Sequence, residues 1–286
     1  MIIARIFGGL GNQLFQYATA RAAAMRAGVP LALDVREANR QLPHQRFALD
    51  HFDIKARIAQ PQDLPPDRTQ RLRYALWRYL GGAPRFTREN GLGLNAEILG
   101  IGDGHYLHGY FQTEKYFADV AQALRRELRI ITPPSDENRA AMELIRSGPS
   151  VSVHLRRGDY VTSQKGAATH GTCDAAYYTR ALAHIAQASQ SAPRAFVFSD
   201  DPDWARDNLE LGVETHVFGQ NGPEQHYEDL RLMSACEHNV IANSTFSWWG
   251  AWLNGSETGL VVAPKNWYAN PKLQNPDIIP ERWIRL

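Results

Sequence analysis

The sequence predicts a two-domain α/β protein in which each domain is built on a parallel, doubly wound sheet. In the second half of the chain, apolar runs typical of strands alternate strictly with helical segments, a pattern that favours parallel strands. The first half opens with the same strand–helix order, and a Ser-Gly-Pro break at 147–149 separates the two halves. We therefore expect domains at 1–148 and 149–286, facing each other across a cleft.

The first half is expected to begin with a strand at Ile2–Phe7, a glycine loop and a helix from about Asn12 to Ala27, which Gly28 ends. Between Asp34 and Leu99 the scattered Pro, Gly and Arg residues favour no particular element. The other expected elements are strands at Leu31–Leu33 and Tyr106–Phe111, a helix from near Thr113 through Leu124, and a helix at Glu137–Arg146.

The second half contains the clearer pattern, in which each apolar strand is followed by a helix. Strands are expected at Val151–Leu155, Ala195–Ser199, Thr215–Phe218, Asn239–Ala242 and Leu260–Ala263, and helices near Ala175–Ala188, Pro202–Leu209, Pro223–Cys236 and Thr245–Leu253.

Composition indicates a globular protein, since 44% of the 286 residues are hydrophobic and 21% are charged. The net charge of +1 gives no reason to expect a nucleic-acid partner. Two cysteines, Cys173 and Cys236, cannot form a disulfide framework and indicate a reducing compartment. Without a signal peptide or an apolar run of membrane-spanning length, we expect a cytoplasmic protein.

The stretch V-S-V-H-L-R-R-G-D-Y, residues 151–160, places a cluster of charged groups where a buried strand ends. His154, Arg156, Arg157 and Asp159 follow one another within six positions. Guanidinium groups bind phosphate oxygens two at a time and keep their charge when desolvated. Because ligands of open α/β sheets bind at the carboxyl ends of strands, this cluster is expected to bind a multiply anionic ligand.

The glycine loop G-G-L-G-N-Q, residues 8–13, lies between the first strand and the first helix. Gly9 and Gly11 fit a dinucleotide fingerprint, but its third glycine would fall at Leu14, so a nicotinamide site is not expected. The glycines still allow close backbone approach, and a helix beginning near Asn12 offers free N–H groups to an anion or hydroxyl. A plain tight turn is the alternative interpretation.

Acidic residues follow the strand F-V-F-S, residues 196–199. Asp201 before Pro202 is typical of a helix N-cap, which leaves Asp200 at the end of the strand. Asp200 can then accept hydrogen bonds from the N–H pair of a guanine base.

The stretch N-S-T-F-S-W-W-G-A-W-L, residues 243–253, is the most specific in the chain. Hydroxyl groups and free N–H groups at a helix start can bind phosphate. The tryptophans at 248, 249 and 252 are expected to pack on the sheet.

Five motifs in this order resemble glycosyltransferase family 11, the α-1,2-fucosyltransferases, over essentially the whole chain. They are G-G-L-G-N-Q-L-F-Q-Y-A at 8–18, G-Y-F-Q-T-E-K-Y-F at 109–117, H-L-R-R-G-D-Y at 154–160, F-S-D-D at 198–201, and the aromatic motif at 243–253. The resemblance implies a GT-B-like pair of Rossmann-type domains. It also implies transfer of fucose from GDP-β-L-fucose, with inversion, to the 2-hydroxyl of a terminal β-galactoside. No metal or other cofactor is implied.

The resemblance also implies which substrate each domain binds. Residues 1–148 would hold the acceptor and residues 149–286 would bind GDP-fucose. Animal members carry an N-terminal membrane anchor, and this chain is expected to lack one, as bacterial members do. The acceptor is expected to be an oligosaccharide or a lipid-linked glycan such as an O-antigen of lipopolysaccharide.

Site residues follow from the motifs. Arg156, Asn12 and Asp159 are the expected catalytic residues. The acceptor-side candidates are Gln13, His108, Gln112 and Glu114, and the general base is left open among His108, Glu114 and Asp159. The expected donor-binding residues are Gly9, Gly11, His154, Arg156, Arg157, Asp200, Asn243, Ser244, Thr245 and Phe246.

Two other functions and one surface are also considered. Asp201 and Asp203 spell the Asp-x-Asp of metal-dependent glycosyltransferases, although capping of a helix also explains them. A non-catalytic galactoside-binding protein is the other alternative. The basic, partly amphipathic stretch at 67–80 is a candidate for peripheral docking at the inner membrane, with an ordinary surface helix as the alternative.

Overall fold

The computed structural model describes residues 1–40, 42–66, 72, 75–76, 84–157, 169 and 171–286. They form two units, Met1–Arg129 and Ile130–Leu286. The predicted boundary at 148 is therefore wrong in position. Helix α5 (Asp136–Arg146), which the prediction placed in the first domain, packs on α10 (His226–Ala235) of the second unit. The Ser-Gly-Pro break is the turn from α5 into the next strand, not a linker between domains.

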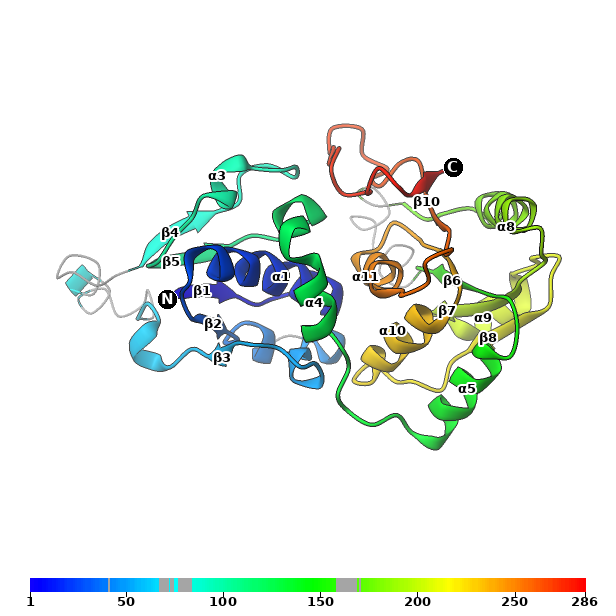
Figure 1. Ribbon diagram of the computed structural model, residues 1–286, viewed down its shortest axis with the longest axis horizontal. Coiled ribbons are helices and arrows are strands. Elements are labelled where there is room, and N and C mark those ends of the chain that lie inside the picture. The colour runs from blue at the N-terminus through cyan, green and yellow to red at the C-terminus, as the bar shows by residue number, and fades with distance from the viewer. Residues whose placement is uncertain (41, 67–71, 73–74, 77–83, 158–168, 170) are drawn as a thin grey trace. The chain divides into compact units, whose positions relative to one another are not determined.

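Unit 1 contains a parallel sheet with the strand order β3-β2-β1-β5-β4. Helix α1 (Leu10–Ala27) packs against β1 and β2 (Figure 1). The strands are β1 (Ile2–Arg5), β2 (Leu31–Asp34), β3 (Arg57–Ile58), β4 (Arg85–Arg88) and β5 (His105–His108), and the shorter helices are α3 (Ala96–Leu99) and α4 (Ala121–Glu127).

The first strand and helix are those predicted, with shifted ends. Helix α1 begins at Leu10, two residues earlier than expected, because Gly8 at φ 76° turns the chain and Gly9 is the N-cap. The left-handed Gly28, at φ 64°, ends the helix as predicted. Strand β1 ends at Arg5, although the Ile6 N–H still donates to the Asp34 carbonyl at 2.9 Å, and the Phe7 N–H donates instead to Gln16 Oε1 at 3.0 Å.

Elements in the middle of unit 1 were not predicted. Strands β3 and β4 and helix α3 are short, and β4 consists of the mostly exposed residues R-F-T-R, which lack an apolar pattern. The helix expected from Thr113 is replaced by two 3₁₀ turns, Glu114–Tyr116 and Ala118–Val120, that precede α4. Most of the stretch 67–80, the candidate for membrane docking or an ordinary surface helix, lies outside the described residues.

Unit 2 contains a six-stranded parallel sheet with the order β11-β10-β9-β6-β7-β8. Counted from β6, this is the 3-2-1-4-5-6 order of a Rossmann fold, and the strand order reverses between β6 and β9. The strands are β6 (Ser150–Leu155), β7 (Arg194–Ser199), β8 (Thr215–Phe218), β9 (His238–Val240), β10 (Val261–Ala263) and β11 (Ile284–Arg285).

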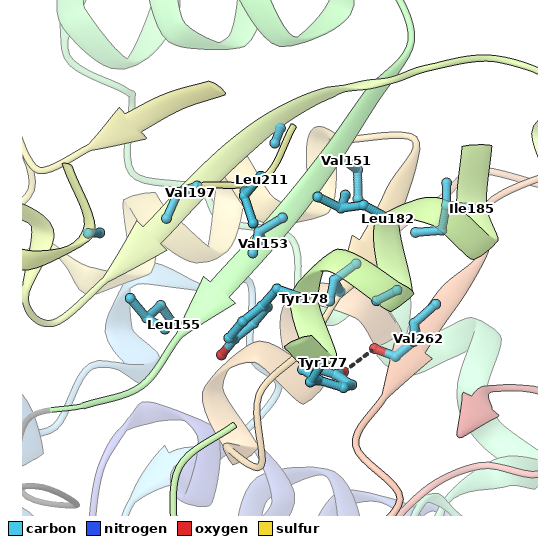
Figure 2. Packing of buried hydrophobic residues seen from close by; sticks show 14 residues of the cluster. Val151, Val153, Leu155, Tyr177, Tyr178, Leu182, Ile185, Val197, Leu211 and Val262 are labelled. Atoms are coloured by element: carbon cyan, nitrogen blue, oxygen red, sulfur yellow. Dashed lines mark hydrogen bonds between the residues drawn. The ribbon is translucent and has the colours of Figure 1, made fainter. Parts of the chain in front are cut away.

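The two faces of β6 have different neighbours because side chains alternate along a strand. Val151, Val153 and Leu155 pack with Tyr178 and Leu182 of α8 (Ala175–Ser189) (Figure 2). The alternate residues, including His154, point to the opposite face, on which α10 contacts β6. The remaining helices are α9 (Pro202–Asn208) and α11 (Thr245–Leu253).

The tryptophans of α11 are core residues, as predicted. Trp248 and Trp249 are fully buried, and Trp248 stacks with Trp252 at a ring-centroid distance of 6.3 Å. Trp248 Nε1 donates a 2.6 Å hydrogen bond to the carbonyl of Ile278. This packing fixes α11 against the C-terminal segment and sets the position of its N-terminus.

Asp229 on α10 gives the stability of the protein a pH dependence. Burial raises the pKa of its carboxyl to about 6, against the opposing hydrogen bond from Asn221 Nδ2 at 2.7 Å. Because the pKa is higher in the folded state, stability is lost as the pH rises from about 4 to about 6. Asp229→Asn is therefore expected to raise the free energy of unfolding at pH 7 by roughly 1–2 kcal/mol, with little change at pH 4.

Denaturant unfolding at both pH values measures this difference, with Asp207→Asn on the exposed face of α9 as the matched control. An equal change at pH 4 and pH 7 in Asp229→Asn would contradict an effect of ionisation.

Among the described residues, no helix is both long enough and apolar enough to cross a membrane.

Candidate functional site

Three neighbouring strands of unit 2 end at the same edge of the sheet. Strand β6 lies between β7 and β9, with Leu155 opposite Ser199 and Val153 opposite Val240. The polar groups that follow these strands are therefore brought to one edge, at the point where the strand order reverses. This arrangement unites the three motifs that begin at 154, 198 and 243, as the sequence predicts.

Asp200 holds the arginine pair at this edge. Its Oδ2 lies 2.8 Å from Arg156 Nη1, and its Oδ1 accepts a 2.9 Å hydrogen bond from the backbone N–H of Arg157. One carboxylate thus orients the side chain of the first arginine and the backbone of the second. Asp159, which the sequence also predicts as a catalytic residue, lies outside the described residues.

Arg157 is held by Trp204, a residue for which no motif of the sequence predicts a role. Its guanidinium carbon lies 3.5 Å from the ring centroid of Trp204, and its Nε lies 3.6 Å from Asp201 Oδ2. Stacking on an indole keeps a guanidinium charged while fixing its plane. Trp204 lies three residues after the F-S-D-D motif at 198–201, and an aromatic residue one turn after a charged strand end was the signal available in the sequence.

His154 is a neutral imidazole at the end of β6. Burial, with a smaller contribution from the Arg156 cation, lowers its pKa to about 3. Its ring lies 5.7 Å from that of Phe246, and its Nδ1 has no hydrogen-bond partner among the described residues. A neutral ring can donate or accept one hydrogen bond, which suits a base or ribose and adds no positive charge beside a diphosphate.

The N-terminus of α11 completes this edge of the sheet. Ser244 is the N-cap, and its hydroxyl accepts from the Phe246 N–H at 3.3 Å. Thr245 is the first helical residue, so its N–H and hydroxyl lie at the positive end of the helix. Ser244, Thr245 and Phe246 thus lie together at this helix start, and binding of phosphate by them stays a prediction.

Asn243 has a structural role in the described residues. Its Nδ2 donates to the carbonyls of Gly171 and Trp267 at 3.3 and 3.2 Å, so the side chain joins two loops. It also lines a cavity of about 390 Å³ whose lining contains neither Arg156 nor Arg157. This geometry favours loop anchoring over the predicted donor contact.

The acids after β7 serve helix α9. Asp201 caps it by accepting from the Trp204 N–H at 3.3 Å, with Pro202 as the first helical residue, as predicted. Asp203 pairs with Arg206 one turn along. Both carboxylates of the Asp-x-Asp sequence are thus engaged at a helix start, and no cluster of metal-ligating side chains is found in the described part of the chain.

Unit 1 carries the other predicted residues, around the start of α1. Gly9 is the N-cap, and Gly11 is buried in the first helical turn. Asn12 lies beside Gly8, where a β-carbon would stand 2.9 Å from Asn12 Nδ2. Gln112 Nε2 donates to Asn12 Oδ1 at 2.9 Å, so the structure joins the first two motifs of the chain.

The other acceptor-side candidates differ in their surroundings. Gln13 is fully buried, donates to the carbonyls of Gly8 and Arg46 and accepts from Ala48, which favours a structural role. His108 packs edge-on against Phe7 at 5.5 Å, and Arg5 Nη1 lies 3.3 Å from its Nδ1.

Glu114, the remaining candidate, begins a 3₁₀ turn after Thr113, whose hydroxyl accepts from the Lys115 N–H at 3.2 Å. Its side chain is half-buried, and its role as a general base stays a prediction.

The chain is similar to known glycosyltransferases over its whole length. It is 32% identical to an Escherichia coli alpha-1,2-colitosyltransferase, covering 100% of this chain and 99% of that protein. It is 28% identical to the Escherichia coli O-antigen biosynthesis glycosyltransferase WbnK, covering 98% of each. It is 26% identical to galactoside alpha-(1,2)-fucosyltransferase 1 of Aotus azarae, covering 88% of this chain and 64% of that protein.

The fold and the family are both recognised. The crystal structure of POFUT1 in complex with GDP matches with a TM-score of 0.50 at 14% identity, covering 91% of this chain and 98% of that one. The family described as Glycosyl transferase family 11 matches residues 90–286. The chain, with its two parallel α/β units of the GT-B fold class, therefore belongs to glycosyltransferase family 11.

Proposed function

We propose that the protein is an inverting transferase that moves L-fucose from GDP-β-L-fucose to the 2-hydroxyl of a terminal β-galactoside. The observation that supports this most directly is the Arg156–Asp200 pair at the switch point of the unit 2 sheet, beside the N-terminus of α11. Fixed positive charge at that place suits the leaving diphosphate of a nucleotide sugar. The GDP in the related POFUT1 structure supports the choice of nucleotide.

Unit 2 would then bind the donor. Cleavage of the sugar–phosphate bond places negative charge on departing GDP, and the Arg156 fork would bind the diphosphate oxygens as this charge develops. Arg157, fixed by Trp204, would support a second phosphate contact. Thr245 and the free N–H groups of α11 would add donors without a metal ion, and neutral His154 would contact the guanosine.

Unit 1 would hold the acceptor through Asn12 and Gln112, whose hydrogen bond places two amides at the start of α1. A displacement with inversion needs a base near the attacking hydroxyl. Glu114, His108 and Asp159 remain the candidates, and an oxocarbenium-like transition state reduces the demand on whichever residue serves.

A second donor is favoured by one observation. The relative that is 32% identical over the full length is named for colitose, a 3-deoxy analogue of fucose. The same nucleotide site would accept GDP-L-colitose, because the two donors share the GDP portion. Fucose has a hydroxyl at the sugar 3-position and colitose does not, so residues outside the arginine cluster would have to distinguish the two donors.

The acceptor is proposed to be a growing O-antigen glycan, as the name of the relative WbnK suggests. A lipid-linked substrate would bring the enzyme to the inner face of the cytoplasmic membrane as a peripheral protein. Pelleting of the protein with anionic liposomes tests docking through residues 67–80.

Incubation with GDP-fucose or GDP-colitose and a panel of β-galactosides, followed by linkage analysis, tests the activity. We expect an α-1,2-linked product from at least one donor, with unchanged rates in EDTA. Loss of activity in EDTA would favour the metal-dependent alternative through Asp201 and Asp203. Galactoside binding without affinity for GDP would instead favour a non-catalytic protein.

A further inference from the structure

The loop after β5 in unit 1 has a strained backbone. Phe111 has φ 53°, in the left-handed region that bulky residues rarely adopt, and its side chain is almost fully buried. The Thr113 N–H donates to the Phe111 carbonyl at 2.8 Å, which tightens the turn further. Such a conformation persists only where the surrounding structure holds it, and it is typical of functional sites.

The carboxylate of Glu89 holds this loop. Its Oε2 accepts from the Tyr110 N–H at 2.6 Å, and its Oε1 accepts from the Phe111 N–H at 2.8 Å. Glu89 follows β4 directly, whereas the loop follows the neighbouring strand β5. The two carboxylate oxygens therefore accept hydrogen bonds from two successive backbone N–H groups, one of which belongs to the strained residue Phe111.

Gly109 makes this approach possible. A β-carbon at position 109 would stand 2.3 Å from Glu89 Cβ and 2.8 Å from Glu89 Oε2. Burial raises the pKa of the Glu89 carboxyl, so placing this charge here has a cost that the two backbone hydrogen bonds offset only in part. Glu89 can therefore lie against this loop only because the first residue of G-Y-F-Q is glycine. Glu89 itself lies outside all five sequence motifs.

The loop carries Gln112, which follows Phe111 directly. Gln112 Nε2 donates to Asn12 Oδ1 at 2.9 Å. A continuous set of contacts therefore runs from the Glu89 carboxylate through the strained backbone to the amide pair at the start of α1.

We propose that Glu89 is a positioning residue that fixes the loop 109–112 and, through it, the Gln112–Asn12 pair for the sugar transfer. The inference deepens the proposed function and rests on the role given there to Asn12 and Gln112. Glu89 touches no substrate in this scheme, and its effect passes through Gln112.

A double-mutant cycle on kcat/KM for the acceptor tests the pathway. Glu89→Gln keeps the size of the side chain but leaves one backbone N–H facing an amide NH₂, and we expect an activity loss of about 10-fold. In Gln112→Ala the same replacement of Glu89 is expected to change kcat/KM by less than about 2-fold, because the affected residue is already absent. Losses that multiply in the double variant, or normal activity of Gln112→Ala, would overturn the proposal.

Two further measurements on Glu89→Gln show whether an activity loss comes from the loop and not from general unfolding or from a damaged donor site. Affinity for GDP, which unit 2 binds in our scheme, is expected to be unchanged in Glu89→Gln. Amide hydrogen exchange at residues 110–112 is expected to become at least about 10-fold faster in Glu89→Gln. The exposed Glu97→Gln on α3 is the matched control for removing a carboxylate and is expected to change neither quantity.

The activity of the wild-type protein distinguishes failure of the proposed function from failure of the positioning role of Glu89. If the wild-type protein transfers neither fucose nor colitose, the proposed function fails. The positioning role is then decided by the exchange at residues 110–112, and unchanged exchange overturns it.

Discussion

Arg156→Ala is expected to lower the turnover number at least ~100-fold while leaving the fold intact, because one charge that stabilises the leaving diphosphate is lost. Arg156 is partly exposed and stands at the end of β6, so its removal creates no cavity in the core. Steady-state kinetics with GDP-fucose and the best acceptor of the panel measure the loss, and thermal unfolding monitors the fold.

Two further variants test whether the loss comes from the charge and planar shape of the Arg156 guanidinium. Arg156→Lys keeps the charge but not the planar fork, and its turnover is expected to fall between those of the wild type and the alanine variant. Arg146→Ala removes an exposed arginine from α5 and is expected to be fully active. Near-normal turnover in Arg156→Ala would refute the role of Arg156.

Asp200→Asn is expected to weaken GDP binding and lower turnover at least ~10-fold, because the amide can no longer hold the Arg156 side chain by an ion pair and the Arg157 backbone at once. Titration with GDP and with IDP, which lacks the guanine 2-amino group, distinguishes two roles. If Asp200 orients the arginines, both affinities fall by the same factor. If it reads guanine as the sequence predicts, the affinity for GDP falls more.

Asp203→Asn is the matched control for Asp200→Asn, because it removes a neighbouring carboxylate that is almost fully exposed. We expect it to retain activity, and a large loss would favour the metal-dependent alternative. Unchanged GDP affinity in Asp200→Asn would contradict both the orienting and the guanine-reading role.

The sequence predicted unit 2 better than unit 1. Strand β8 and helix α11 have the expected bounds, and β6 and α8 differ by one residue at one end, because buried apolar runs and their capping residues specify these elements locally. In unit 1, β4 is mostly exposed and has no apolar alternation, so it forms only through pairing with β5. Pairing between distant segments has no local signal in the chain.

The candidate site divides in the same way. Arg156, Asp200 and Ser244 were found from the sequence because each follows an apolar strand at a recognisable position. The sequence predicts no role for Trp204 or Glu89, because each contacts a residue that is distant in the chain. Trp204 stacks on Arg157, which lies 47 positions away, and Glu89 binds the backbone of Tyr110, which lies 21 positions away, each at the end of another strand. For Gln13 and Asn243 the motif identified the residue, while the contacts with backbone carbonyls identified a structural role.

The sequence by itself determined the fold class, the family and the three strand ends that carry the charged groups. Only the tertiary structure decided that Asp200 pairs with Arg156, that Trp204 stacks on Arg157 and that Glu89 holds the loop of Gln112. The physical reason is range: periodicity and capping act within a few residues and can be read along the chain. The partner of a charged group, by contrast, depends on which strand ends the parallel sheet brings together.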